Sequence, residues 1–396
     1  MLRNYAGSAS FMILALSIPW TLGCDNAYNQ NAANQDKAPN PNEALTHGIN
    51  FLLQKQMEDG SWRSEYYATF RDGTALTPLV LLALEYAYGK QNEHPDLERA
   101  IKRGFGFLAQ YVSDHGSVLE PKDGFDYPVY TAALAIRVLS HPLAQGRERE
   151  RAAWVRYLKD RQLTDKLGWK PADKAYGGWG YCRIIPRKPE PDKFSPPLLE
   201  SNLSATVFAL DALASARELD ATTRQAAAIF VRRCQNDDGG FHFIYDDPVR
   251  NKGGVATWKP LRFHSYGSTT ADGLRALVLC NCPEDRDRIA QAATWLTKHF
   301  NAKTHPGQYA PAHEVNRNAV YYYYVASLAQ TWALSPELFP DLEAKRKHLV
   351  VGLAERQGHD GSWTNPLSLV REDEPLVATS FAVIAISQCL SERTTR

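Results

Sequence analysis

A seven-residue pattern recurs three times along this 396-residue chain and constrains its fold more than any other feature. Residues 56–62 read QMEDGSW, residues 357–363 read QGHDGSW, and residues 235–241 read QNDDGGF, with phenylalanine in place of tryptophan. Each copy ends a segment with helical periodicity and precedes a polar loop and an alanine-rich apolar segment. We therefore expect a repeating unit of two helices joined by a long loop.

Six such units can be read along the chain, and two helices in each predict twelve helices in all. The units begin near residues 47, 100, 152, 226, 290 and 348. One helix pair cannot bury its apolar surface alone, so neighbouring pairs must stack. The second segment of each pair is richer in alanine, which indicates an inner, crowded position. The repeat leaves open whether the stack closes into a ring or continues as an open superhelix.

The repeated turn consists of residues that suit a structural role. Its Asp-Gly dipeptide is a turn signal, in which glycine supplies a positive φ where the first helix ends. Trp62 and Trp363 can then fold back over the helix end, where burying about 150–250 Å² each contributes a few kcal/mol. The side-chain amides of Gln56, Gln235 and Gln357 can satisfy free backbone groups. We interpret these turns as staples between neighbouring units, with substrate contact as the less favoured alternative.

The pattern Gln-x-x-x-Gly-x-Trp resembles the QW motif of the squalene cyclase and protein prenyltransferase superfamily. The string YGGWGY at residues 176–181 is similar to glycine-tryptophan variants found there, and the likeness covers roughly residues 43–392. The resemblance implies an all-α fold, a closed (α/α)6 toroid of about twelve helices. First helices would lie outside, second helices inside, and the long loops would gather at one mouth.

The N-terminus has the pattern of an export signal. Arg3 precedes the apolar segment FMILALSIPW at residues 11–20, which is shorter than the roughly 20 apolar residues that span a bilayer. The string TLGC, ending at Cys24, resembles the lipobox of bacterial lipoproteins, in which the cysteine is lipidated. We therefore expect residues 1–24 to be a signal peptide with a lipidation site at Cys24.

The residues that follow Cys24 predict a tether and then one folded domain. Residues 25–43 are too polar to bury a core, so we expect a disordered tether there and a single toroid over residues 44–392. A lipid on Cys24 would anchor the protein to a membrane. Because Thr21 replaces the usual leucine of the lipobox, plain secretion stays open as the alternative. Both interpretations predict an exported protein of the cell envelope.

The charge and cysteine content exclude several classes of partner. The chain carries 45 basic and 44 acidic side chains and has no basic run suited to a phosphate backbone, so we expect no nucleic-acid partner. No CxxC pair occurs, and no zinc cluster or other metal site is indicated. We also expect no cofactor.

Two long loops, residues 170–202 and 241–267, carry most of the candidate site residues. If the long loops follow the first helix of each pair, the positive N-termini of all six inner helices point to one mouth. We expect function there. The predicted substrate-binding residues are Trp179, Tyr181, Glu200, Trp258, His264, Tyr266 and Tyr321.

Three carboxyl groups, Asp246, Asp247 and Asp272, are the candidate catalytic acids. Adjacent carboxylates can share a proton, because each charge raises the pKa of its neighbour. The alternative for Asp246-Asp247 is a solvated turn. Class II terpene cyclases, which belong to the superfamily that this chain resembles, protonate an alkene with an Asp-x-Asp-Asp motif. The nearest string here is IYDD, in which Ile244 replaces the first aspartate.

Aromatic residues are frequent on the predicted inner helices. Tyr321 to Tyr324 form a run, and Tyr130, Phe208 and Phe381 occupy related positions in other units. An aromatic wall suits carbocations and flat apolar ligands, although such residues are as often plain core. A protein prenyltransferase would also need an Asp-x-Cys zinc motif, and none occurs here.

Two classes of function remain after these observations. The first is a terpene cyclase-like enzyme that acts on an isoprenoid or another apolar small molecule at the envelope. The second is a non-catalytic toroid that binds a lipid, glycan or protein. A polysaccharide lyase using Arg262, His264 and Tyr266 is a third option, supported by residue types alone. Convergence of the candidate acids and Glu200 in one aromatic pocket would favour the enzyme.

Overall fold

Helices dominate the computed structural model, which describes residues 40–89 and 95–390. Six helices form an inner layer: α2 (Leu76–Tyr88), α4 (Pro128–Val138), α6 (Leu203–Ser215), α8 (Gly267–Cys280), α11 (Tyr321–Leu334) and α13 (Pro375–Cys389). Six form an outer layer: α1 (Pro41–Gln54), α3 (Pro95–Ala109), α5 (Glu148–Lys159), α7 (Ala221–Arg233), α9 (Arg286–His299) and α12 (Leu342–Ala354). The single-turn α10 (Pro311–Glu314) lies in a loop. The predicted six pairs are all present.

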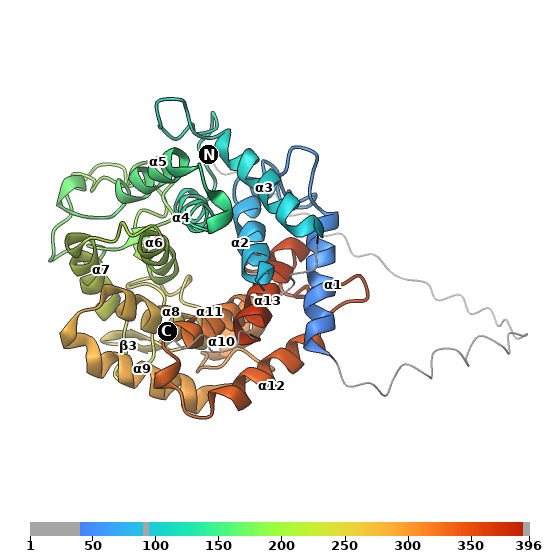
Figure 1. Ribbon diagram of the computed structural model, residues 1–396. Helices are drawn as coiled ribbons and strands as arrows, with labels where there is room; N and C mark the ends of the chain where they lie inside the picture. The colour runs from blue at the N-terminus through green and yellow to red at the C-terminus, as the bar shows by residue number, and fades with distance from the viewer. Residues whose placement is uncertain (1–39, 90–94, 391–396) are drawn as a thin grey trace, which may run out of the picture. The chain divides into compact units, whose positions relative to one another are not determined.

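The helix pairs close into a ring (Figure 1). Each inner helix packs against the next one along the chain, and the last, α13, packs against the first, α2. In the outer layer α12 contacts α1, and Gln357 Nε2 donates a hydrogen bond to the Ala44 carbonyl of α1 over 2.9 Å. The chain is therefore the closed α/α toroid that the family resemblance implied, and the open superhelix, which the repeat alone had left open, is wrong.

Four glutamine-bearing turns link neighbouring units. In each, one glutamine Nε2 donates to a carbonyl of its own turn and to a carbonyl of the next outer helix. The glutamines and their two acceptor residues are Gln56 with Gly60 and Ala100, Gln162 with Gly177 and Thr223, Gln235 with Gly239 and Arg288, and Gln357 with Gly361 and Ala44. The Gln162 turn was hidden in the sequence because residues 163–176 separate the glutamine from its glycine.

The glycine of each turn is required by close approach of the next unit. Gly177 has a φ of +96°, and a Cβ there would lie 1.8 Å from the Ala226 carbonyl oxygen. At Gly60, with a φ of +86°, a Cβ would lie 2.4 Å from the Arg103 carbonyl oxygen. Only glycine fits such a backbone contact without displacing a helix.

The remaining structure lies mostly in the connections. Strand β1 (Trp179–Gly180) pairs antiparallel with β2 (Ser201–Asn202), and β3 (Val255–Trp258) pairs antiparallel with β4 (Leu261–Phe263). The 3-10 turns are η2 (Ala68–Phe70), η3 (Pro142–Ala144), η4 (Asp165–Leu167), η5 (Pro283–Asp285), η6 (Arg317–Val320) and η7 (Pro336–Leu338). Across residues 40–89 and 95–390, no helix has the length and apolarity needed to cross a membrane.

The N-terminal predictions fall mostly outside the described residues. The signal peptide, Cys24 and residues 25–39 of the tether all precede the first described residue, Asn40. Helix α1 begins at Pro41, and the Asn40 side chain caps it by accepting from the Asn42 backbone N–H over 3.0 Å. Residues 41–43, which we expected in the tether, therefore belong to the first turn of the toroid.

Candidate functional site

A cavity of about 440 Å³ lies among the inner helices, at their N-terminal ends. The long loops line one end of the cavity and the inner helices line the rest, as the repeat predicted. Its apolar and aromatic lining residues are Phe70, Leu76, Leu79, Tyr127, Tyr130, Leu134, Tyr181, Phe208, Phe243, Tyr266, Val320, Tyr323, Leu369, Val370, Val377 and Phe381. We call this space the central cavity.

Aromatic rings contact one another along one wall of the central cavity. Phe208 meets the Tyr130 ring edge-on at a centroid distance of 4.8 Å and stacks against Tyr323 at 6.2 Å. Phe381 meets Tyr323 edge-on at a centroid distance of 5.5 Å. The ring faces can stabilise a positive charge that develops in the cavity.

The predicted substrate residue Tyr321 lies away from the cavity, which corrects the sequence interpretation. Its hydroxyl donates to the Ala302 carbonyl over 2.5 Å, and the Arg356 guanidinium lies 4.3 Å from its ring centre. Two residues further along α11, Tyr323 faces the cavity instead. The sequence could not choose among four consecutive tyrosines, because a helix turns about 100° per residue and only the packing fixes which one points inward.

Asp272, on α8, is one of two fully buried carboxyl groups that line the central cavity. Its Oδ2 accepts from the Tyr323 hydroxyl over 2.7 Å, and its Oδ1 accepts from the Ser327 hydroxyl over 2.5 Å. Burial raises its pKa above the ordinary value, although Arg275 and these two hydroxyls act in the opposite direction. The candidate acid Asp272 is therefore held where a neutral, protonated carboxyl group is favoured.

A second carboxyl group of the cavity, Glu372, was missed by the sequence reasoning. Burial raises its pKa to about 7, against the lowering effect of backbone hydrogen bonds from Tyr323 and Tyr322. These N–H groups, at the start of α11, donate over 2.8 and 3.0 Å, and Asn365 Nδ2 donates over 2.9 Å. In the sequence it sits in the charged string REDE, which looks like a solvated loop, and only the closed ring buries it.

The paired acids Asp246 and Asp247 do not act together and neither lines the central cavity, which corrects their assignment. Asp246 is exposed and forms an ion pair with Lys174. Asp247 forms an ion pair with Arg250. Although burial opposes it, hydrogen bonds from Arg250 and the ion pair hold the pKa of Asp247 below its ordinary value. Because each carboxylate has its own cation, no proton is shared, and the solvated turn is the better description.

Two predicted substrate residues do line the central cavity. The Tyr181 hydroxyl lies 2.8 Å from both the Tyr130 hydroxyl and the Ser204 hydroxyl. Tyr266, at the start of α8, is buried, and its hydroxyl accepts from the Lys252 backbone N–H over 3.4 Å. Their role as substrate contacts stays a prediction.

Four other predicted substrate residues lie outside the central cavity. Trp179 is a staple: its Nε1 donates to the Leu158 carbonyl over 2.9 Å, just as Trp62 and Trp363 bond to the outer helices of their own units. Trp258 is 70% exposed on the β3–β4 hairpin. Glu200 and His264 also lie elsewhere, the first in an ion pair with Arg250 over 3.0 Å and the second in a separate cleft.

The lyase residues are divided between two spaces. Arg262 and His264 line the separate cleft, whereas Tyr266 lines the central cavity. A base and a neutralising cation must act on one substrate, so this trio does not form a lyase site.

Three cationic side chains, Arg250, Lys252 and Arg371, line the central cavity. Arg250 is held by Asp247 and Glu200, and its Nη1 is buried with no hydrogen-bond partner in the described part of the chain. Burial lowers the pKa of Lys252, and its amine has no ion pair among the described residues. The loop end of the cavity is therefore cationic, while its walls are apolar.

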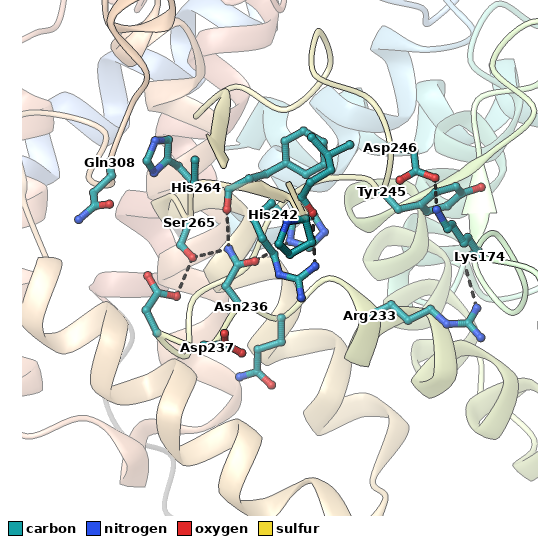
Figure 2. Close-up of a pocket in the computed structure, with 17 residues that line it drawn as sticks. Lys174, Arg233, Asn236, Asp237, His242, Tyr245, Asp246, His264, Ser265 and Gln308 are labelled. Carbon is teal, nitrogen blue, oxygen red and sulfur yellow. Dashed lines mark hydrogen bonds and ion pairs between the residues drawn. The ribbon is translucent and has the colours of Figure 1, made fainter. Parts of the chain in front are cut away.

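The separate, larger space is a polar cleft of about 720 Å³ beside the β3–β4 hairpin, which we call the outer cleft (Figure 2). Its labelled lining residues are Lys174, Arg233, Asn236, Asp237, His242, Tyr245, Asp246, His264, Ser265 and Gln308. Over the described residues, no group of three or more His, Cys, Asp or Glu side chains is arranged to hold a metal ion.

No protein-family model and no curated protein sequence matches the chain. Among solved structures, type II terpene cyclase MstE from Scytonema, in complex with its substrate geranylgeranyl dihydroxybenzoate, has a TM-score of 0.56 at 13% identity over 88% of this chain and 98% of its own. D-mannose isomerase has a TM-score of 0.55 at 14% identity over 88% of this chain and 95% of its own. Cellobiose 2-epimerase from Bacillus thermoamylovorans has a TM-score of 0.55 at 11% identity over 87% and 98%. The chain shares the toroid fold of these enzymes.

Proposed function

We propose that the central cavity binds an isoprenoid-like apolar chain and transforms it by acid catalysis, with Asp272 as the acid. The observation that carries the proposal is a fully buried carboxyl group in a cavity with aromatic walls. The fold does not separate this chemistry from that of the sugar isomerases and epimerases. The aromatic wall favours an apolar substrate, because Phe208, Tyr323 and Phe381 present their rings to the cavity that Asp272 lines.

Protonated Asp272 can start the reaction by giving its proton to a carbon–carbon double bond. The O–H bond breaks, the π electrons form the new C–H bond, and a carbocation remains on the substrate. The carboxylate that is left accepts hydrogen bonds from the Tyr323 and Ser327 hydroxyls, and these hydrogen bonds stabilise its charge. A second alkene of the same chain can add to the cation. The final cation then loses a proton to water, and Asp272 takes up a proton from solvent, so the reaction is a net isomerisation.

The aromatic wall supports the same proposal. The rings of Phe208, Tyr323 and Phe381 border the cavity that Asp272 lines, so a cation formed beside the carboxyl group meets ring faces. Their attraction is worth about 0.5–2 kcal/mol per ring when water is excluded. Apolar walls also keep water from capturing the cation early.

The cationic loop end suggests a ligand with an acidic head and an apolar tail. Within residues 40–89 and 95–390, Arg250 Nη1 has no hydrogen-bond partner and the Lys252 amine has no ion pair, and both can meet a carboxylate or phosphate. The MstE substrate, geranylgeranyl dihydroxybenzoate, has such a form. We propose that the tail extends from the loop end toward Asp272.

The proposal is tested by incubating the folded protein with squalene, polyprenols and prenylated hydroxybenzoates and analysing the products by mass spectrometry. Wild type should give an isomer of one substrate, and Asp272→Asn should give none. Asp246→Asn is the matched control, because its carboxylate is exposed and should leave turnover unchanged. Absence of turnover by wild type, with a bound lipid recovered intact, would favour the non-catalytic binding toroid.

We also propose an envelope location for the toroid, tethered through Cys24. The lipobox-like string supports this, and an apolar ligand is most concentrated in a membrane. Labelling of the expressing cells with radioactive palmitate should mark the wild-type protein but not Cys24→Ser. An unlabelled wild-type protein found in the medium would instead support secretion.

A further inference from the structure

The outer cleft contains a buried histidine, His242, that the proposed chemistry does not use. The side chain is 8% exposed, and the exposed part lines the cleft (Figure 2). Its ring packs against Phe263 of β4 at a centroid distance of 5.6 Å. Polar atoms of a largely buried ring usually have hydrogen-bond partners. Only one of the two ring nitrogens, Nδ1, has a partner in the described structure.

The tautomer of His242 follows from its neighbour. Asn236 Nδ2 donates to the Phe263 carbonyl over 3.0 Å, which fixes the orientation of the amide, since a carbonyl can only accept. Asn236 Oδ1 then faces His242 Nδ1 at 3.0 Å and must accept from it. Nδ1 therefore carries the proton of the neutral ring, and Nε2 is a free hydrogen-bond acceptor at the cleft.

Further hydrogen bonds hold Asn236 in place. Its Nδ2 also donates to Ser265 Oγ over 2.7 Å, and that hydroxyl donates to Asp238 Oδ1 over 2.8 Å. Asp238 Oδ2 in turn accepts from Trp295 Nε1 over 3.1 Å. The imidazole orientation is thus fixed by a chain of contacts that ends in an outer helix, α9.

The other copies of the turn lack this arrangement. In QMEDGSW the aspartate Asp59 bonds to Ser61 within the turn, and in QGHDGSW Asp360 bonds to Ser362 in the same way. In QNDDGGF the serine is replaced by Gly240, so Asp238 is free to bond to Ser265 on another segment. The staple does not need this change, because the first and last turns close their units without it.

The charges of the outer cleft restrict what can bind. Lys174 and Asp246 are paired, and Arg233 donates to backbone carbonyls. The carboxylates of Asp237 and Asp238 balance the two arginines of the lining, so the cleft carries no formal net charge. An anion offers only acceptors and cannot satisfy His242 Nε2, whereas the charge of Arg262 reaches the ring and disfavours a cation. Metal binding is not supported either, since no suitable group of three ligands is found in the described residues. A neutral hydroxyl donor fits best.

We propose that the outer cleft binds a neutral carbohydrate, with a sugar hydroxyl donating to His242 Nε2. The exposed side chain of Gln308 and the guanidinium of Arg262 offer planar sets of donors for adjacent hydroxyls, and Tyr245 offers a ring face. Burial, assisted by Arg262, lowers the pKa of His242 to about 4, so the acceptor stays available at neutral pH. The site is independent of the central cavity and of its proposed chemistry.

The test uses cello-, malto- and chito-hexaose with the full chain, observed through the side-chain nitrogen-15 signals of histidine. In the free protein His242 should show an unprotonated Nε2, and one of the sugars should shift that signal with a Kd near or below about 1 mM. His242→Phe keeps the packing against Phe263 and should weaken binding at least tenfold. Gln308→Ala, at an exposed position, should weaken it about threefold.

The matched control is His359→Phe, because His359 is exposed and lies in the last copy of the turn, outside the outer cleft. This variant should bind sugar like wild type. The proposal is wrong if no hexaose moves the His242 signal at ~10 mM. Equal affinity in wild type and His242→Phe, or binding of acidic oligosaccharides or peptides alone, would overturn it as well.

Discussion

The central cavity contains a buried acid and the outer cleft a buried base, and burial favours the uncharged form of each. Asp272 is buried among aromatic rings, and burial raises its pKa. His242 is buried beneath a polar cleft, and burial lowers its pKa to about 4. In both cases the medium disfavours the charged form. Burial therefore shifts the carboxyl group toward the protonated form that the proposed chemistry uses, and the imidazole keeps a lone pair that can accept a hydrogen bond.

The two spaces also differ in how the repeat produces them. The central cavity exists because the ring closes, so all six units contribute to it through their inner helices. The outer cleft belongs mainly to the fourth unit, where the turn departs from the other copies at Asn236 and Gly240. A closed ring thus offers one shared site, and a single altered turn adds a local one without disturbing it.

The largest expected effect separates the two sites. Asp272→Asn should reduce turnover of an isoprenoid substrate by about 10²–10⁴-fold, because the amide has no proton of suitable acidity to give. Its affinity for a neutral hexaose should stay at the wild-type value. His242→Phe should show the reverse, with turnover intact and sugar binding weakened. Product analysis and sugar titration on the same preparations measure both.

The comparison would be contradicted if one substitution abolished both turnover and sugar binding. If Asp272→Asn also lost sugar binding while its thermal unfolding matched wild type, the two sites would be coupled. Tyr323→Phe sharpens the result, because it removes one hydroxyl from Asp272 and keeps the ring. We expect it to lower turnover by less than Asp272→Asn does.

A second prediction uses opposite pH dependences of stability. The pKa of Glu372 is raised from 4.5 to about 7, so its contribution to stability is full below 4.5 and is lost as the pH rises through 7. The pKa of His242 is lowered from 6.5 to about 4, so its contribution is present above 6.5 and is lost as the pH falls through 4. Each loss is on the order of 3 kcal/mol.

Urea unfolding in half-unit steps from pH 4 to 8 measures these effects. Glu372→Gln should flatten the decline of the unfolding free energy as the pH rises from 4.5 to 7, and His242→Phe should flatten the decline as the pH falls from 6.5 to 4. The pKa of Asp272 is also raised, and burial lowers the pKa of His305 to about 3. Both groups are unchanged in these variants, so each variant should keep part of the wild-type pH dependence. Identical slopes in wild type and both variants would refute the assigned protonation states.

The sequence predicted the helix pairs well because each copy of the repeated turn marks the end of one outer helix. The turns at Gln56 and Gln357 keep glutamine, glycine and tryptophan at fixed spacing, since the same backbone contacts recur in each unit. Gln162 and Trp179 make the same contacts across an insertion, which hid the turn and left Trp179 looking like a ligand residue. Ring closure could be expected only from the family resemblance, because no local pattern encodes it.

The site was less predictable because burial is a property of the closed ring. Asp247 looked like an acid because it adjoins Asp246, but Arg250, three residues further on, neutralises it. Glu372 looked solvated, although the start of α11 covers it and donates two backbone hydrogen bonds. Asp272 was named because it lies near the start of a predicted inner helix, and the packing of that helix in the ring buries it.

A third prediction concerns the altered turn of the fourth unit. A Cβ at Gly240 would lie 2.5 Å from Ser265 Cβ and 2.7 Å from its Oγ. Gly240→Ala should therefore displace Ser265, lower the unfolding free energy by about 1–3 kcal/mol, and weaken sugar binding. Gly106→Ala is the control, because nothing lies within 4 Å of a Cβ there, and it should stabilise α3 slightly. Unchanged sugar binding in Gly240→Ala would mean that Ser265 does not orient Asn236.

The smallest expected effect tests the loop end of the central cavity. Lys252 lines it, and burial lowers the pKa of its amine, so the charge is costly unless a ligand pairs with it. Lys252→Met should weaken binding of a prenylated hydroxybenzoate by about tenfold and leave binding of the corresponding prenyl alcohol unchanged, because only the acid carries a charge for the amine. Fluorescence titration of both ligands measures the difference. Equal losses would show that Lys252 contributes packing alone, and the tail would then be the part of the ligand that the cavity recognises.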